Sequence, residues 1–111
     1  MSISRLTREL RDLNPETRIK AAMNLGEMKA AETLPTLLNV FKKETDEKVR
    51  SVMAEALASF TDFDDVINAL KFAVDNDKSE LVRISAEWSL KQISKSRGYA
   101  DLQSLLDDME E

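Results

Sequence analysis

The stretch that decides the fold of this chain is Thr45-Asp46-Glu47-Lys48-Val49-Arg50-Ser51-Val52-Met53-Ala54-Glu55-Ala56-Leu57. Its large apolar residues Val49, Met53 and Leu57 recur every four residues, so they lie along one face of a helix. Apolar and polar residues do not alternate here, as they would in a half-buried strand. The stretch therefore predicts a helix that packs its apolar face against another part of the chain.

The same pattern occurs three times. Its arginine recurs as Arg18, Arg50 and Arg83, at spacings of 32 and 33 residues. A leucine follows each arginine by seven residues: Leu25, Leu57 and Leu90. A second helical pattern lies between these stretches, in Ile3-Leu6-Leu10, Leu34-Leu37-Phe41, Val66-Ala69-Ala73 and Tyr99-Leu102-Leu106. A period of about 20–50 residues with two helices per unit is typical of a solenoid, because each pair buries its apolar face against the next pair.

Two stretches, Asn14–Gly26 and Thr45–Leu57, resemble HEAT repeats, most closely the short type also found in phycobilin-lyase-like proteins. In both, an acidic or proline-containing turn precedes the arginine, and small residues and a leucine follow it. The third unit departs from the pattern with Glu87 and Ser89 at positions that are usually small and apolar, which indicates an end unit with one face toward water. The resemblance covers nearly the whole chain. It implies antiparallel helix pairs, with an outer convex layer and an inner concave layer that bears the arginines.

The predicted fold is an all-α superhelix, a HEAT-like solenoid of about seven antiparallel helices in three to three and a half repeats. A single domain over residues 1–111 is expected, with units at about 1–30, 31–62 and 63–96 and a capping helix at 97–111. The outer helices are expected at about 3–13, 33–43, 64–75 and 99–109, and the inner helices at about 15–28, 46–60 and 78–95.

The composition argues against catalysis. The 111 residues include no Cys and no His, so thiolate sites, the commonest general base and the commonest transition-metal ligand are missing. The two glycines are isolated and form no phosphate-binding loop. Acidic pairs such as Asp64-Asp65 are adjacent on a helix, and adjacent residues do not face each other. We therefore expect no enzyme, with no catalytic residue, metal or cofactor.

The sequence also lacks membrane and targeting signals. No run approaches the length of a membrane-spanning helix, and the amino-terminal residues lack the apolar stretch of a signal peptide. We therefore expect a cytoplasmic protein without membrane contact.

Charge is distributed unevenly along the chain. Residues 1–43 carry a net charge of +3 and residues 44–111 a net charge of −8, which gives −5 in total. The chain is expected to be a monomer or to self-associate weakly, with the basic front of one copy against the acidic rear of another. A nucleic-acid partner is disfavoured, because it calls for a basic stripe and usually for stacking aromatic residues.

An acid stands six residues before each repeated arginine. These acids are Asp12, Glu44 and Asp77, which precede Arg18, Arg50 and Arg83. We expect each carboxylate to accept hydrogen bonds from the guanidinium group of its own unit, so that a structural arginine ladder runs along the solenoid. The alternative is that the arginines hold a phosphate or an acidic peptide, for which the flanking acids would compete.

The inner helices also predict a binding surface. The side opposite the core carries apolar residues where a merely solvated face would be charged. The candidate groove residues are Ile19, Met23, Val52, Glu55, Ile84, Trp88 and Lys91. Trp and Met suit dominant and adaptable contacts, so the groove is expected to take a helix or extended segment of another protein. In the alternative, helix tilt turns these residues into contacts between units, and Trp88 covers the last unit.

The leading functional hypothesis is a non-enzymatic protein–protein interaction module, a scaffold or adaptor that binds a partner segment on its concave face. Two alternatives stay open. One is a lyase-like or chaperone-like subunit that handles a cofactor-bearing protein, which only the family resemblance favours. The other is a nucleic-acid binder. The sequence does not identify the partner.

Overall fold

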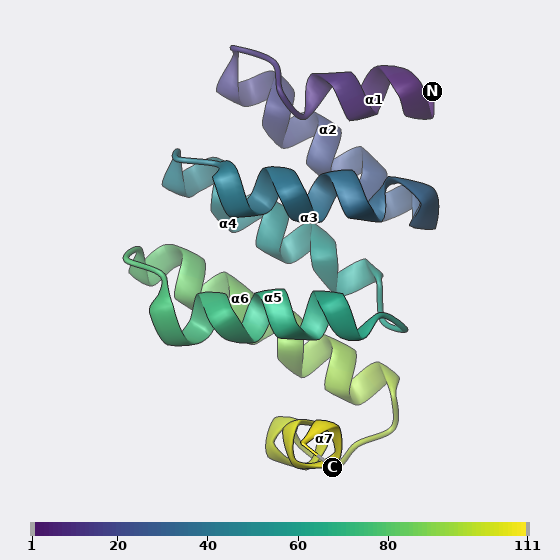
Figure 1. Cartoon of the computed structure of the whole chain (residues 1–111), viewed down its shortest axis with the longest axis vertical. Helices are drawn as coiled ribbons and strands as arrows, with labels where there is room; N and C mark the ends of the chain where they lie inside the picture. Colours follow the sequence, from purple (N-terminus) through teal and green to yellow (C-terminus); the bar gives the residue numbers. More distant parts are fainter. Residues whose placement is uncertain (1, 111) are drawn as a thin grey trace.

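The computed structural model describes residues 2–110, which form seven α-helices and two short 3₁₀ turns (Figure 1). The helices are α1 (Ile3–Glu9), α2 (Pro15–Met28), α3 (Leu34–Lys43), α4 (Glu47–Ala56), α5 (Asp64–Asn76), α6 (Glu80–Ser96) and α7 (Leu102–Met109), and the 3₁₀ turns are η1 (Ala31–Thr33) and η2 (Leu57–Ser59). Residues 2–110 contain no strand, and the predicted all-α solenoid is confirmed.

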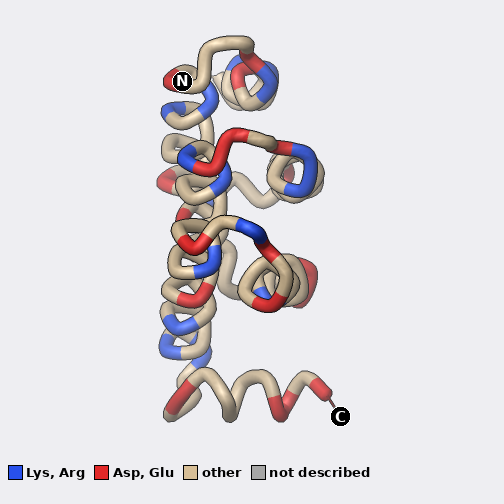
Figure 2. Tube along the Cα trace, turned by 90° about the vertical axis from the view of Figure 1, so that its left-hand side faces the viewer, with Lys and Arg blue, Asp and Glu red and all other residues tan. Residues whose placement is uncertain are grey.

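Two layers of helices build the stack. The outer helices α1, α3 and α5 lie one below another, and the inner helices α2, α4 and α6 cross behind them (Figure 1). Figure 2 shows the same stack from the side, with the inner helices in one column and the outer helices beside it. Successive units are in contact mainly through the inner layer, where α4 packs against both α2 and α6. The molecule measures 39 × 28 × 18 Å, and its long axis follows the stack.

The three inner helices begin in the same way. Four residues before each ladder arginine stands a capping residue, Asn14, Asp46 or Ser79, whose side chain accepts a hydrogen bond from a backbone N–H of the first helical turn. Such caps satisfy N–H groups that have no partner inside the helix. Pro15 follows Asn14 as the first residue of α2, where its missing N–H costs nothing.

The core is continuous from the first unit to the last. The three repeated leucines, Leu25, Leu57 and Leu90, are at most 1% exposed and belong to this core. Burial of these side chains between two layers is the main favourable contribution to folding.

The inner helix α2 lies close to the neighbouring unit at Gly26. A Cβ atom at this position would lie 3.2 Å from both the Cβ atom and the carbonyl oxygen of Ala56 on the neighbouring unit. The neighbouring atoms belong to backbone or to a short side chain, so they have little freedom to move away. The glycine therefore sets the spacing of α2 and α4.

Replacing Gly26 by Ala is expected to lower the free energy of unfolding by about 1–2 kcal/mol, because overpacking outweighs the gain in helix propensity. The measurement is urea unfolding followed by circular dichroism. Glu27→Ala is the matched control, since Glu27 is exposed on the same helix and should change stability by less than about 0.5 kcal/mol. A more stable Gly26→Ala protein would show that the two helices separate easily.

Helix α1 is shorter than predicted, and it ends at Glu9 instead of near residue 13. The turn that follows is held by its own polar contacts. Asp12 accepts a hydrogen bond from the backbone N–H of Asn14, and the guanidinium group of Arg18 donates to the carbonyl oxygens of Asp12 and Leu13. Leu13 lies in this turn, beyond the end of α1, and is 96% exposed.

Helix α7 was predicted as a fourth outer helix, and this prediction is wrong. Figure 1 shows α7 end-on, whereas α1, α3 and α5 are seen from the side, so α7 crosses the end of the stack. Gly98 has a φ of +85° in the turn that redirects the chain. Asp101 then caps α7, and hydrogen bonds from the backbone N–H and hydroxyl of Ser104 lower its pKa. Leu105 is fully buried, so α7 covers apolar surface at this end of the core.

Candidate functional site

The inner row consists of Met23, Glu55 and Trp88, which stand five residues after the ladder arginines on α2, α4 and α6. All three are exposed, Met23 to 50% and Trp88 to 49%. Each inner helix thus presents one side chain of this row to solvent, on the side away from the core. These residues were assigned to the groove from the sequence, and their role in binding stays a prediction.

Ile19 does not lie on this surface. It is only 8% exposed, and it occupies the repeat position directly after the arginine. In the second unit that position is Ser51, whose hydroxyl oxygen lies 2.6 Å from that of Ser85 on the next unit. The position faces the following inner helix and not solvent. The groove assignment of Ile19 is therefore wrong, and the alternative, contact between units, describes it.

Ile84 has the same repeat position in the third unit, yet it is 59% exposed. Within residues 2–110 no further inner helix follows α6, so nothing packs on this side of it. Lys91, on the same helix, is exposed and forms an ion pair of 2.9 Å with Glu87. Val52 is half-buried against the core. The predicted groove residues are thus divided between the inner face and the rear end of α6.

The inner hollow is a depression of about 710 Å³ that borders Trp88. Its walls come from the end of α4, η2, the loop before α5, and α6, and they include Glu55 and Phe63. Phe63 is 38% exposed and meets the buried ring of Phe60 edge-on, with ring centroids 6.4 Å apart. Phe63 was not predicted as a site residue, because it lies in a loop where helical periodicity carries no information.

The arginine ladder connects the units, but not through the predicted pairs. Nε of Arg18 donates to Oε1 of Glu44 over 2.8 Å, and the guanidinium group of Arg50 binds the carboxylate of Asp77. Each of these acids belongs to the unit after the arginine. The acid six residues before an arginine contributes its backbone carbonyl oxygen instead, as Asp12 does to Arg18 over 2.7 Å. The carboxylates of Asp12, Glu44 and Asp77 accept hydrogen bonds from backbone N–H groups of their own turns.

Two of the three ladder arginines are fully engaged. The side chains of Arg18 and Arg50 are 16% and 17% exposed, and the guanidinium group of Arg50 also lies 4.7 Å from the ring centroid of Phe41. These contacts leave little of either guanidinium group accessible to a phosphate or an acidic peptide. Arg83 differs, since its described hydrogen bond goes to the carbonyl oxygen of Asp77 alone.

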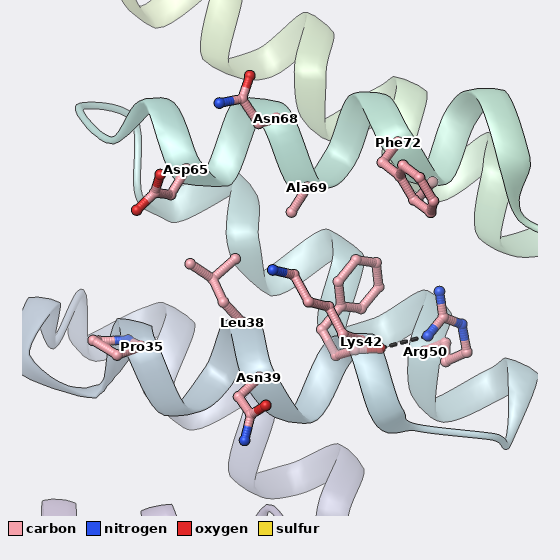
Figure 3. A pocket seen from close by; sticks show the side chains of 11 residues that line it. Pro35, Leu38, Asn39, Lys42, Arg50, Asp65, Asn68, Ala69 and Phe72 are labelled. Atoms are coloured by element: carbon pink, nitrogen blue, oxygen red, sulfur yellow. Dashed lines mark hydrogen bonds between the residues drawn. The ribbon is translucent and has the colours of Figure 1, made fainter.

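The outer hollow is a second depression, of about 790 Å³, between α3 and α5 (Figure 3). Leu38 and Lys42 reach into it from α3, and Ala69 and Phe72 border it on α5. Phe72 is 69% exposed, and it was not among the predicted site residues. The spacing of Asp65, Ala69 and Phe72 places them on one side of α5, and this was the only sequence signal for the hollow.

A metal centre needs several ligating side chains close together, and a membrane span needs a long apolar helix. Residues 2–110 hold no group of three or more His, Cys, Asp or Glu side chains suited to a metal ion. No helix in this part of the chain has the length and apolar character needed to cross a membrane.

Comparison with known protein families identifies the family of this chain. The family model for HEAT repeats matches residues 3–109, which include all seven helices of the structure. No curated protein matches the sequence. HEAT repeats are generally protein-interaction scaffolds, and the family is typically non-enzymatic. With a 32- to 33-residue period, paired helices in two layers and a family match over nearly its whole length, this chain belongs to the HEAT-repeat family.

Proposed function

We propose that this chain is a protein-interaction module, a small scaffold or adaptor, that binds a segment of a partner protein on its inner face. The observation that supports it most is the inner hollow with Trp88 at its edge. The inner hollow, of about 710 Å³, is bordered by side chains of two inner helices, Glu55 of α4 and Trp88 of α6. Trp88 is half-exposed beside it, and Trp is the residue type most enriched among dominant interface contacts.

The chemistry of the hollow defines the partner segment. Trp88 and Phe63 offer aromatic surface for an apolar side chain, and Lys29, Glu55 and Asp62 place charges of both signs around it. An apolar centre with a charged rim is the usual arrangement of an interface. The best fit is therefore a segment with one large apolar side chain flanked by charged residues. Along the inner row, Met23 extends the contact surface toward the first unit, where its flexible side chain can adapt to different shapes.

Replacing Trp88 by Ala is expected to weaken partner binding by at least about tenfold, because a dominant aromatic contact contributes about 2 kcal/mol or more. The partner is first captured with the wild-type chain, identified, and purified. It is then titrated into the wild-type chain while the fluorescence of Trp88, the single Trp, is followed. Calorimetric titration gives the affinity of the variant. Unfolding of Trp88→Ala is measured in parallel, and a loss below about 2 kcal/mol is expected for this half-exposed residue.

The matched control is Phe72→Ala, which removes an exposed aromatic side chain from the outer hollow. It should leave the affinity unchanged. Intact binding by Trp88→Ala together with lost stability would contradict the proposed site. Loss of binding in Phe72→Ala alone would move the site to the outer layer.

A further inference from the structure

The arginine ladder is open at both ends of the stack. Each internal pair joins an arginine to the acid six residues before the next arginine, as in Arg18–Glu44 and Arg50–Asp77. Arg83 is the last arginine of the series, and it has no carboxylate partner among residues 2–110. Asp12 is the first acid, and within the same residues no arginine side chain binds its carboxylate. The end of the ladder at Arg83 therefore lacks an acid, and the end at Asp12 lacks an arginine.

Asp77 shows how a ladder acid is used. Its Oδ1 accepts a hydrogen bond of 3.0 Å from the backbone N–H of Ser79, and its Oδ2 binds Arg50 of the preceding unit. Asp12 repeats the first of these contacts, because its Oδ1 accepts a hydrogen bond of 2.8 Å from the backbone N–H of Asn14. Its second oxygen has no side-chain donor within residues 2–110. Asp12 is thus oriented like Asp77 and can receive a guanidinium group on its open side.

We propose that a second copy of this chain stacks head-to-tail on the first, so that Arg83 of one copy binds Asp12 of the next in the way that Arg50 binds Asp77. The contact repeats the step between units at the exposed start of α6, on the part of the rear surface that α7 leaves open. It uses the ends of the stack and leaves the inner row exposed, so it does not depend on the partner site at Trp88.

The two end surfaces complement each other beyond this pair. Ile84 has the repeat position of Ser51, which contacts Ser85 in the next unit, and the residue of the next copy equivalent to Ser85 is Lys20. Glu87 has the position of Ala54, whose carbonyl oxygen accepts a hydrogen bond of 2.7 Å from the Ser89 hydroxyl of the next unit. In stacked copies, Ile84 would lie along the aliphatic part of Lys20, and Glu87 would lie near Asn24, the residue of the next copy equivalent to Ser89.

The front surface has room for such a contact. A hollow of about 230 Å³ lies between α1 and α2, with Arg5, Lys20 and Asn24 around a floor that includes Leu6 and Ala21. Arg5 is 71% exposed at its rim and forms only a loose pair of 3.6 Å with Glu9. An apolar side chain from the rear of another copy, such as Ile84, would fit its apolar floor.

Charge at the two ends favours the same orientation. Arg5 and Arg8 lie on α1 at the front, whereas the charged residues of α7 at the rear are Asp107 and Asp108 (Figure 2). Helix α7 crosses the rear of the stack but leaves Ile84 largely exposed. The basic residues of α1 and the acidic residues of α7 attract each other when two copies meet front to rear, and α6 adds the cation Arg83 to the rear surface opposite Asp12.

A head-to-tail contact joins two different surfaces, so it does not close at two copies. Sedimentation velocity of the wild-type chain at low salt should show a mean mass that rises with protein concentration and passes beyond the dimer. Added salt should reduce it, because the end charges are screened. A chain that stays monomeric at all concentrations, or that stops at the dimer, would overturn the proposal.

The pair itself is tested by exchanging its charges. Arg83→Asp and Asp12→Lys should each weaken self-association by about tenfold or more, since each places like charges in contact. An equimolar mixture of the two variants should regain the wild-type behaviour. The carboxylate introduced in one variant then meets the ammonium group introduced in the other, and the unaltered Arg83 and Asp12 meet at the alternate contact. Association of either variant at wild-type strength, or a mixture without recovery, would overturn the pairing.

Two controls separate the pair from general charge effects. Lys48→Asp and Glu32→Lys make the same changes of net charge at exposed positions within the stack, and both should associate like the wild-type chain. Circular dichroism verifies the fold of each variant. Asp12 is exposed in a turn, so Asp12→Lys keeps the test valid even if Arg83→Asp loses stability.

Discussion

Replacing Leu57 by Ala is expected to lower the free energy of unfolding by about 3–4 kcal/mol, since truncation of a buried Leu costs about 2–5 kcal/mol. Leu57 is 0% exposed and lies in the central unit, at the end of α4. Units on both sides restrict how far the surrounding structure can collapse into the cavity. The expected loss is therefore in the upper part of the range, and it is a large share of the stability of a domain of this size.

The measurement is equilibrium unfolding in urea, with the transition followed by both far-ultraviolet circular dichroism and the fluorescence of Trp88. Leu13→Ala is the matched control, because Leu13 has the same side chain at 96% exposure and should change stability by less than about 0.5 kcal/mol. Similar losses for the two substitutions would contradict the central position of Leu57. Separate transitions for the two signals would show that the units unfold independently.

Replacing Arg50 by Ala is expected to cost about 3 kcal/mol, near the lower end of the range of about 3–5 kcal/mol for breaking a buried ion pair on one side. The guanidinium group of Arg50 binds the carboxylate of Asp77, donates to the carbonyl oxygens of Phe41 and Glu44, and lies over the ring of Phe41. Its removal leaves the side chain of Asp77, which is only 9% exposed, without its cationic partner. The partial exposure of Arg50 places this pair at the lower end of the range.

Arg83→Ala is the control for the ladder, since Arg83 has the same repeat position but donates only to the carbonyl oxygen of Asp77. Its loss should cost about 1 kcal/mol, the usual contribution of one hydrogen bond. A double-mutant cycle between Arg50 and Asp77 then isolates the energy of their interaction. Equal losses in Arg50→Ala and Arg83→Ala would show that the contact between units adds nothing, and the ladder would have no structural role.

The ladder also bears on the proposed function. Glu55 and Trp88 come from different units, and the Arg50–Asp77 pair joins those two units. Partner binding across two helices benefits when their spacing is already set, because less conformational freedom is lost on association. If the chain binds a partner as proposed, Arg50 would support the surface around Trp88 without itself contacting that partner.

Several features followed from the sequence with few errors. The inner helices α2, α4 and α6 begin within about two residues of the predicted positions, because Asn14, Asp46 and Ser79 are strong capping residues at a fixed distance before each arginine. The burial of Leu25, Leu57 and Leu90 followed from the repeat itself. Capping and helical periodicity depend on residues that are close together in the sequence. They can therefore be predicted without knowing which segments pack against each other.

Other features depended on which surfaces meet. The sequence placed Glu44 with Arg50, whereas the structure pairs Glu44 with Arg18, because the carboxylate points across the gap between units. The exposure of Phe72 depends on how α3 and α5 lie side by side, which the pattern of either helix alone does not contain.

The sequence by itself determined that the chain is helical, the period of its repeats, the starts of the inner helices, the burial of the repeated leucines and the family. Only the tertiary structure decided which repeated positions are open to a partner. Ile19 and Ile84 are the same residue type at the same repeat position, yet one is 8% and the other 59% exposed. The difference arises because α4 packs on the first and no inner helix within residues 2–110 packs on the second. Periodicity fixes the direction of a side chain on its own helix, and the surface opposite decides whether it is core or interface.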